Sequence, residues 1–262
     1  MQTDKPLLSV VLPTYNEAGN IAVIVERLSG VLAATPHEII VADDDSPDLT
    51  WKKVQELCAR IPHLKVIRRT ADRGLYPAVM EGFANASGKY LAVMDADLQH
   101  DEKILPRMLE LAQNGAQLVV ASRYTGGGGT AGWSGTRLLA SRLANKSASL
   151  LLKRRCTDLM SGFFLVERAA FEQAKPKLHP RGFKIFMDVL QNLPDGARVA
   201  EAGYVFRPRT AGESKLSLKV TLEAAAGLYE LSLGRYVPLK ALLFALGLLA
   251  AAAAALLFTA GL

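Results

Sequence analysis

Apolar and polar residues alternate in blocks along the first half of the chain. Short continuous apolar runs predict buried strands, and apolar residues three and four positions apart predict helices. The apolar runs predict strands at 7–12, 38–42, 64–67, 89–94 and 117–121. The helical spacing lies between them, at 21–32, 49–60, 76–86 and 104–113. Strands and helices in alternation predict an α/β fold whose sheet is mostly parallel and carries helices on both faces.

The second half of the chain contains more irregular segments. A glycine-rich stretch at 125–133 formally contains G-x-G-x-x-G, but the acidic residue that a dinucleotide site needs about twenty positions later is absent. This stretch is interpreted either as a flexible surface loop or as a lid that orders over a substrate. Further helices are predicted at 137–152 and 183–193, and further strands after 158–164 and at 199–206.

Polar residues gather where three of the predicted strands end, at 15–17, 43–44 and 95–97. In open α/β sheets, ligands bind beyond the carboxyl ends of the strands. These three clusters are therefore expected to converge, and their convergence predicts a site for a nucleotide diphosphate.

Asp95 and Asp97 suggest the chemistry of that site. Residues i and i+2 of an extended chain point the same way, so both carboxylates are expected to face one spot. Gln99 joins them if the chain stays extended. Two neighbouring anions repel unless a cation lies between them. Oxygen ligands suit Mg²⁺ or Mn²⁺, and Mg²⁺ is commonly shared with substrate phosphates. A solvated turn with two acids is the alternative interpretation.

Composition narrows the class of protein. Of the 262 residues, 50% are hydrophobic and 21% are charged, which is typical of a globular protein. Cys58 and Cys156 have no metal-binding or redox spacing, so a reduced, cytosolic setting is expected. The polar start of the chain predicts no secretory signal, and the four histidines show no metal-ligand or triad spacing. The net charge of +6 favours anionic lipid or a phosphorylated substrate over nucleic acid, because no nucleic-acid-binding motif accompanies it.

The last part of the chain predicts contact with a membrane. A cationic loop at 207–215 precedes a helical pattern at 216–233, which fits either a core helix or a helix in the membrane interface. Residues 241–262 are 22 positions without a charge, which at about 1.5 Å per residue can cross a bilayer. Arg235 and Lys240 precede this stretch, so the positive-inside rule places the amino-terminal domain in the cytoplasm.

Several short motifs, in order along the chain, resemble those of one enzyme family. They are Pro13-Thr14-Tyr15-Asn16-Glu17, the acidic run at 43–48, Gly74-Leu75, Gly82-Phe83, Asp95-Ala96-Asp97-Leu98-Gln99-His100, Ser122-Arg123-Tyr124, Arg137 with Ser141, Ser161-Gly162-Phe163-Phe164 and the loop at 209–215. The set resembles the family-2 inverting glycosyltransferases of GT-A fold, in particular the dolichol-phosphate mannose synthase and polyprenyl-phosphate glycosyltransferase type. Asp45 departs from this pattern, because such proteins usually carry Gly or Asn there, and Asp101 replaces a frequent Pro.

The resemblance implies transfer of a hexose, mannose or glucose, from a nucleotide diphosphate sugar such as GDP-mannose to a polyprenyl phosphate, with Mg²⁺ or Mn²⁺ as cofactor. It implies a GT-A catalytic domain, which is expected at 1–215, while the hydropathy pattern predicts an amphipathic membrane-interface helix at 216–236 and a transmembrane helix at 237–262. The catalytic domain is expected at the cytoplasmic face of the membrane.

The resemblance also implies roles for individual residues. Arg209 and Lys215 are expected on a mobile loop that closes over the phosphates. The implied nucleotide-binding residues are Pro13, Tyr15, Glu17, Asp43, Asp44, Asp95 and Ala96. The implied metal ligands are Asp95, Asp97 and Gln99, the acceptor-phosphate ligands are Arg123, Arg137 and Ser141, and the catalytic residues are Asp95, Asp97, Arg123, Arg209 and Lys215.

Two alternatives stay open on the sequence alone. One is a catalytically silent, membrane-tethered protein that binds a nucleotide sugar. The other is a glycosyltransferase with a different lipid or polysaccharide acceptor, although the Q-x-x-R-W-type motif common in those enzymes is absent. Proteins of this type carry none, two or more membrane spans. Because only one span is predicted here, further membrane subunits or self-association are possible partners that would supply the rest of the membrane part.

Overall fold

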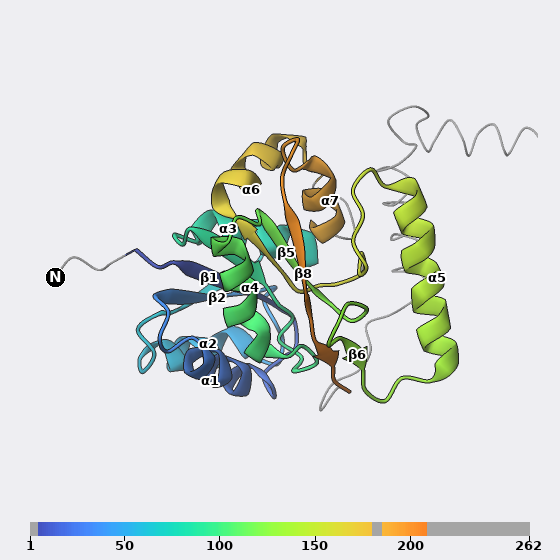
Figure 1. Cartoon of the computed structure of the whole chain (residues 1–262). Helices are drawn as coiled ribbons and strands as arrows, with labels where there is room; N and C mark the ends of the chain where they lie inside the picture. The colour runs from blue at the N-terminus through green and yellow to red at the C-terminus, as the bar shows by residue number, and fades with distance from the viewer. Residues whose placement is uncertain (1–4, 180–184, 209–262) are drawn as a thin grey trace, which may run out of the picture.

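The computed structural model describes residues 5–179 and 185–208, and a seven-stranded sheet forms its centre (Figure 1). The strand order is β3-β2-β1-β4-β7-β5-β8. Neighbouring strands are parallel except at β7, which runs antiparallel to both β4 and β5. The strands are β1 Leu8–Thr14, β2 His37–Asp43, β3 Leu64–Arg68, β4 Tyr90–Val93, β5 Leu118–Ser122, β7 Phe164–Glu167 and β8 Val199–Gly203. The mostly parallel α/β sheet that the sequence predicts is confirmed.

Helices cover both faces of the sheet, because successive residues of a strand point to opposite sides. Val10 and Val11 are consecutive in β1 and fully buried, and they belong to different hydrophobic cores. The Val10 core contains side chains of α1 Ile21–Val31, α2 Thr50–Cys58 and α4 Leu105–Gln113, with the short 3₁₀ turn Glu102–Ile104 leading into α4. The Val11 core contains side chains of α3 Leu75–Asn85, α6 Arg168–Ala174 and α7 Ile185–Asn192, with the 3₁₀ turn Lys175–Lys177 after α6.

Part of the glycine-rich stretch is a paired strand. β6 Gly129–Thr130 pairs in parallel with β9 Val205–Phe206. Gly203 allows the stretch to pass close over β8, because a Cβ atom there would collide with the carbonyl oxygen of Gly126. The stretch is thereby attached to the segment after β8, and it leads into α5 Gly135–Leu151, which stands at the right-hand edge of the molecule in Figure 1.

Several predicted features lie outside the described residues. They are Arg209, Lys215, the interface helix at 216–236, the transmembrane helix at 237–262 and the first residues of the helix predicted at 183–193. Within 5–179 and 185–208, no helix is both long enough and apolar enough to span a bilayer.

One buried carboxylate connects the beginnings of three strands. Glu38 of β2 accepts hydrogen bonds from Ser9 Oγ at 2.6 Å, from Lys65 Nζ at 2.6 Å and from the backbone N–H of Ser87 at 2.6 Å. Burial by itself would raise the pKa of Glu38, but these bonds outweigh burial and lower the pKa from 4.5 to about 2.

Replacing Glu38 with Gln is expected to destabilise the fold at neutral pH by about 1.5–3 kcal/mol, the value of hydrogen bonds to a charged group. A carboxyl group whose pKa is lower in the folded state stabilises the fold above its unfolded pKa, and this contribution disappears as the pH falls through its folded pKa. The difference between the native and Glu38→Gln proteins should therefore shrink as the pH falls from 4.5 towards 2. Urea unfolding at several pH values measures it, and a difference independent of pH would contradict the assignment.

Candidate active site

The predicted nucleotide-binding residues lie together at one edge of the sheet. Pro13 belongs to β1, and Tyr15 and Glu17 follow that strand, while Asp43 ends β2 and Asp44 comes next. Asp95 and Ala96 follow β4, and the three strands are neighbours in the order β2-β1-β4. The carboxyl ends of parallel strands meet at one edge, so the three polar clusters converge there as predicted.

The chain turns sharply within the acidic motif. Asp97 is buried, and its Oδ1 accepts a hydrogen bond from the backbone N–H of Gln99 at 3.1 Å. The side chain of Asp95 is 41% exposed. Leu98 has a φ of 63°, in the left-handed region that non-glycine residues seldom adopt. The chain therefore does not stay extended through Gln99, the condition under which alternation alone would aim Gln99 at the two carboxylates, because a left-handed residue turns the backbone away from the strand direction.

Gln99 is bonded to the segment that follows β9. Its side-chain Nε2 donates to the backbone oxygen of Arg207 at 3.0 Å, and the Arg207 backbone N–H donates to the Gln99 carbonyl oxygen at 2.8 Å. The Arg207 guanidinium also bonds Asp101 at 2.7 Å. The bond to Arg207 uses the nitrogen of the Gln99 amide, so it is compatible with a metal-binding role for the amide oxygen.

The chemistry of the acidic motif fits a hard divalent cation. Asp95, Asp97 and Gln99 offer oxygen atoms, which Mg²⁺ and Mn²⁺ prefer. Burial raises the pKa of the Tyr204 hydroxyl; Arg123 opposes this shift, while the charges of Asp158, Asp95 and Asp97 add to it. Among the described residues, no cluster of three or more His, Cys, Asp or Glu side chains could hold a metal. A site here would thus combine two carboxylates with an amide oxygen.

Asp43 connects the loops that follow β1 and β2. Its carboxylate is fully buried and accepts hydrogen bonds from Thr14 Oγ1 at 2.8 Å, Ser46 Oγ at 2.6 Å and the Ser46 N–H at 2.8 Å. The Asn16 N–H donates to Ser46 Oγ at 3.0 Å. Asp43 therefore orders the two loops, and its contact with a nucleotide stays a prediction.

Asp44 is bonded to a buried arginine that had no predicted role. Arg69 is 3% exposed, and its guanidinium bonds Asp44 and, at 2.8 Å, Glu81. The Gly74 N–H donates to Asp44 Oδ2 at 2.6 Å. Burial raises the pKa of Asp44, although these partners oppose the shift.

Asp45, the departure from the family pattern, is balanced within the protein. Its carboxylate bonds Arg68 at 2.7 Å and Arg73 at 2.7 Å. Its φ is 52°, a conformation that Gly and Asn adopt more readily than most residues. Two arginines therefore compensate the extra negative charge.

Arg123, which directly follows β5, is anchored by Asp158. Arg123 Nε and Nη2 each lie 2.7 Å from an Asp158 carboxylate oxygen, and the Arg123 backbone N–H donates to the same side chain at 3.0 Å. Asp158 is fully buried. Burial would lower the pKa of Arg123, but the bonds and charge of Asp158 reverse this and raise it. The guanidinium is held rigidly, with one edge occupied by Asp158.

Trp133 brings Arg123 and Arg137 together. The guanidinium carbon of Arg137 lies 4.1 Å from the centre of the Trp133 ring, and that of Arg123 lies 5.4 Å from it. Arg123 also lies 5.5 Å from the Tyr124 ring, whose hydroxyl donates to Ser141 Oγ at 2.7 Å. The three residues predicted to hold the acceptor phosphate are thus joined through two aromatic side chains.

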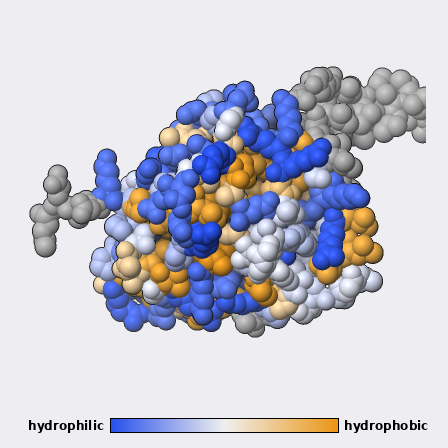
Figure 2. Space-filling model, viewed as in Figure 1, coloured by the Kyte–Doolittle hydropathy of each residue, from blue (hydrophilic) through white to orange (hydrophobic). Residues whose placement is uncertain are grey.

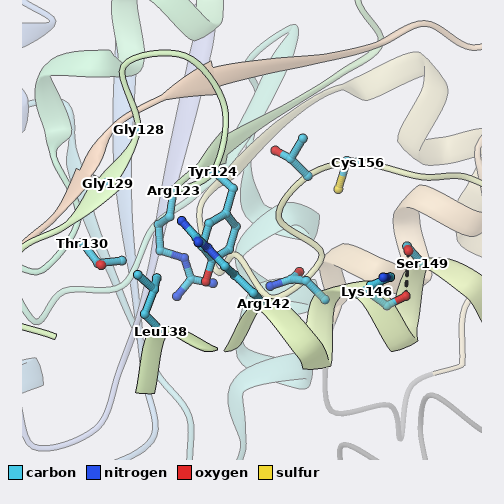
Figure 3. A pocket seen from close by; sticks show the side chains of 12 residues that line it. Arg123, Tyr124, Gly128, Gly129, Thr130, Leu138, Arg142, Lys146, Ser149 and Cys156 are labelled. Carbon is cyan, nitrogen blue, oxygen red and sulfur yellow. Dashed lines mark hydrogen bonds between the residues drawn. The ribbon is translucent and has the colours of Figure 1, made fainter. Parts of the chain in front are cut away.

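A cavity of about 730 Å³ lies between Arg123, the glycine-rich stretch and α5 (Figure 3). Arg123, Arg142 and Lys146 give its lining a positive charge. Cys156 also lines it, and burial raises the pKa of this thiol to about 12, so the reactive thiolate form is scarce at neutral pH.

His100 and Tyr204 had no predicted role, because they lie 104 residues apart in sequence. His100 is 3% exposed, and its ring bonds both Asp95 and Tyr204. The spacing of histidines in the sequence carries no sign of this. The position of His100 directly after the acidic motif was the only available signal.

The model of the glycosyl transferase family 2 matches residues 9–174. The chain belongs to this family. The match includes Asp95, Asp97, Arg123, Arg137 and Ser141, so it covers both the acidic and the cationic parts of the site.

Two sequence relatives in the family are dolichol-phosphate mannosyltransferases. That of Pyrococcus furiosus is 41% identical over 226 residues, which are 86% of this chain and 63% of that protein. That of Saccharomyces cerevisiae is 34% identical over 245 residues, which are 90% of this chain and 91% of that protein. The chain therefore spans less than two thirds of the archaeal relative and most of the yeast relative.

Solved structures of other glycosyltransferases share the fold. Glucosyl-3-phosphoglycerate synthase from Mycobacterium tuberculosis has a TM-score of 0.61 at 19% identity, covering 87% of this chain and 81% of that one. A mannosyltransferase from Pyrobaculum calidifontis, solved with GDP-Man and Mn²⁺, has a TM-score of 0.52 at 19% identity, covering 79% of this chain and 58% of that one. These likenesses confirm the predicted GT-A type of α/β fold.

Proposed function

We propose that this chain is an inverting glycosyltransferase that moves a hexose from a nucleotide diphosphate sugar to the phosphate of a polyprenyl phosphate. The observation that carries the proposal is an acidic site directly beside a cationic one. Residues 204–207 bond 99–102 on one side and 129–131 on the other. The likeness to dolichol-phosphate mannosyltransferases supports mannose as the sugar.

The acidic side would bind the donor. Asp95, Asp97 and Gln99 would hold Mg²⁺ or Mn²⁺, which supplies charge neutralisation for the leaving diphosphate when it is bound. The two ordered loops after β1 and β2 would hold the nucleoside, with Tyr15 exposed beside them. GDP-mannose is the donor we propose first.

The cationic side would bind the acceptor. Arg137, Ser141 and the free edge of Arg123 would position the lipid phosphate, which is already anionic at neutral pH and needs no strong general base. One of its oxygens bonds to the anomeric carbon while the bond from that carbon to the diphosphate oxygen breaks on the opposite face, so the configuration inverts. Positioning and charge neutralisation then account for the catalysis. Arg209 and Lys215 would close over the phosphates, a role that rests on the sequence.

A screen of nucleotide sugars against a labelled polyprenyl phosphate in detergent, with Mg²⁺ or Mn²⁺, tests the proposal. We expect a glycosylated lipid and one equivalent of free nucleoside diphosphate, with GDP-mannose as the best donor. Binding of a sugar nucleotide without release of diphosphate would favour a silent binding protein. Transfer to a diglyceride or polysaccharide instead would support glycosyltransferase activity but contradict the proposed polyprenyl phosphate acceptor.

Replacing Trp133 with Ala is expected to raise the KM for the lipid phosphate. A guanidinium stacked on an aromatic ring keeps its N–H groups free for an oxyanion, and the stacking stabilises it by about 1–2 kcal/mol. The KM should therefore rise about five- to thirtyfold, and Trp133→Phe should recover part of the loss.

Trp51 offers a matched control for this measurement. The Trp51 ring lies 4.0 Å from the guanidinium of Arg68, on the nucleotide side of the molecule. Trp51→Ala should leave the acceptor KM unchanged, and equal effects of the two substitutions would contradict the role of Trp133.

The exposed face of α5 supports contact with a membrane. Leu139 and Leu143 are one turn apart, 60% and 55% exposed, and Arg142 and Lys146 lie beside them on the same helix. Figure 2 shows hydrophobic surface at the right-hand edge of the molecule, where α5 stands in Figure 1. Apolar side chains flanked by cations are typical of a helix that rests in a lipid interface. The cytoplasmic side of that membrane is proposed from the positive-inside rule.

In a chain that ends at residue 236, before the transmembrane helix expected at 237–262, Leu139→Gln with Leu143→Gln should weaken binding to anionic lipid vesicles at least about tenfold, since each leucine removed from lipid costs about 1 kcal/mol or more. Flotation of vesicles in a density gradient measures it. Val23→Gln is the control, because Val23 is 38% exposed on α1. Unchanged flotation of the double variant would show that the exposed face of α5 does not contact the membrane.

A further inference from the structure

A chain of hydrogen bonds connects the acidic motif to a buried tyrosine. Tyr204, which is 2% exposed, lies with its hydroxyl 2.9 Å from Nδ1 of His100. The other ring nitrogen of His100, Nε2, lies 3.3 Å from Oδ2 of Asp95. His100 is 3% exposed. One imidazole thus lies between a phenol and a predicted metal ligand.

Chemistry determines the direction of these bonds in the neutral imidazole. An ionised carboxylate only accepts hydrogen bonds, so Nε2 of His100 carries the proton and donates to Asp95. Nδ1 then holds the lone pair and accepts the hydroxyl proton of Tyr204. Tyr204 therefore selects the tautomer of His100 that can bond Asp95.

The surroundings hold the imidazole ring in place. Its centre lies 5.3 Å from the ring of Phe163 and 5.4 Å from the ring of Phe206, each in an edge-to-face arrangement. Gly162 lies close to the same carboxylate, because a Cβ atom added to it would be 3.1 Å from Asp95 Oδ2. The Asp95 side chain is 41% exposed, and His100 and Gly162 both lie beside its Oδ2 atom.

The same strand segment holds two of the predicted metal ligands. Tyr204 reaches Asp95 through His100, and the backbone of Arg207 bonds the side-chain amide of Gln99. Residues 204–207 are in turn bonded to the glycine-rich stretch, through the Gly129 N–H to the Tyr204 carbonyl oxygen at 3.0 Å. Ligand orientation at the acidic motif thus depends on a segment about one hundred residues away in sequence, the separation of Tyr204 and His100 being 104.

We propose that His100 is a positioning residue of the metal site, which Tyr204 holds in the tautomer and orientation that aim the Asp95 carboxylate at the cation. The inference rests on the proposed function. Partners that orient metal ligands typically change metal affinity about ten- to a hundredfold when they are replaced.

Two substitutions of His100 separate this role from simple packing. The amide of a glutamine reaches the place of Nε2 and can still donate to Asp95, whereas the shorter asparagine reaches the place of Nδ1 and meets only Tyr204. His100→Gln should therefore retain Mn²⁺ affinity within about threefold, and His100→Asn should lose about ten- to a hundredfold. Tyr204→Phe, which keeps the buried ring and removes the hydroxyl, should also weaken Mn²⁺ binding.

The measurement is the electron paramagnetic resonance signal of free Mn²⁺ during titration of the full chain, with GDP and, separately, with UDP. Thermal unfolding of each variant establishes that it is folded. Equal Mn²⁺ affinity of the native, His100→Asn and Tyr204→Phe proteins would overturn the positioning role and leave the proposed function intact. A native chain that binds no Mn²⁺ with either nucleotide would overturn both. Equal losses of Mn²⁺ affinity in His100→Gln and His100→Asn would show that His100 contributes by packing alone.

Discussion

Replacing Asp158 with Ala is expected to lower the free energy of unfolding by about 3–5 kcal/mol, because it leaves a buried arginine without its partner. Asp158 is fully buried, and the side chain of Arg123 is 9% exposed. The carboxylate accepts three hydrogen bonds, all from Arg123. Glycosyl transfer should also be lost, since the guanidinium is no longer aimed at the site. Chemical denaturation and turnover of the same preparation measure the two effects.

A double variant separates stability from activity at this pair. Apolar residues of similar volume often replace a buried ion pair without loss of stability, and sometimes with a gain. Arg123→Met with Asp158→Leu should therefore recover most of the stability that Asp158→Ala loses, yet stay inactive. Recovery of both stability and turnover would show that Arg123 has a structural role only, and the proposed phosphate contact would be wrong.

An Asp97→Ala protein is expected to lose turnover by roughly a thousandfold. A bound cation contributes several kcal/mol of charge stabilisation in the transition state, and about 4 kcal/mol corresponds to that loss. Asp97→Asn keeps an oxygen that can accept the N–H of Gln99, so it preserves the turn at Leu98 while removing the charge. Both variants should be inactive, and the asparagine variant should be the more stable one.

Steady-state kinetics with increasing Mg²⁺ or Mn²⁺ tests the role of Asp97. Glu110→Gln is the control, because Glu110 is an exposed acid on α4 that pairs with Arg107. It should retain native turnover. Full turnover of Asp97→Ala at any metal concentration would remove Asp97 from the metal site.

The order of strands and helices follows from apolar patterning. A parallel sheet is buried on both faces, so its strands are continuous apolar runs, and Val10 and Val11 illustrate this in β1. The same logic places Asp43 and Asp95 at one edge of the sheet, because parallel strands share a carboxyl end. The antiparallel insertion of β7 between β4 and β5 was not predicted, since apolar patterning contains no information on strand direction.

Side-chain partners within the site could not be predicted in the same way. Asp45 was noted as an extra charge, but only the tertiary structure brings Arg68 and Arg73 to it. The turn at Leu98 could not be predicted either, because leucine has no preference for the left-handed region.

The sequence by itself determined the α/β class, the sheet edge at which the acidic clusters meet and the family to which the chain belongs, because periodicity and motif order are local properties of a chain. Tertiary structure alone decided that Asp158 anchors Arg123, 35 residues away, and that Tyr204 reaches His100 across 104 residues. Those pairs depend on the register of β7 and on the parallel pairing of β9 with β6, and no local pattern encodes the direction in which a distant side chain points.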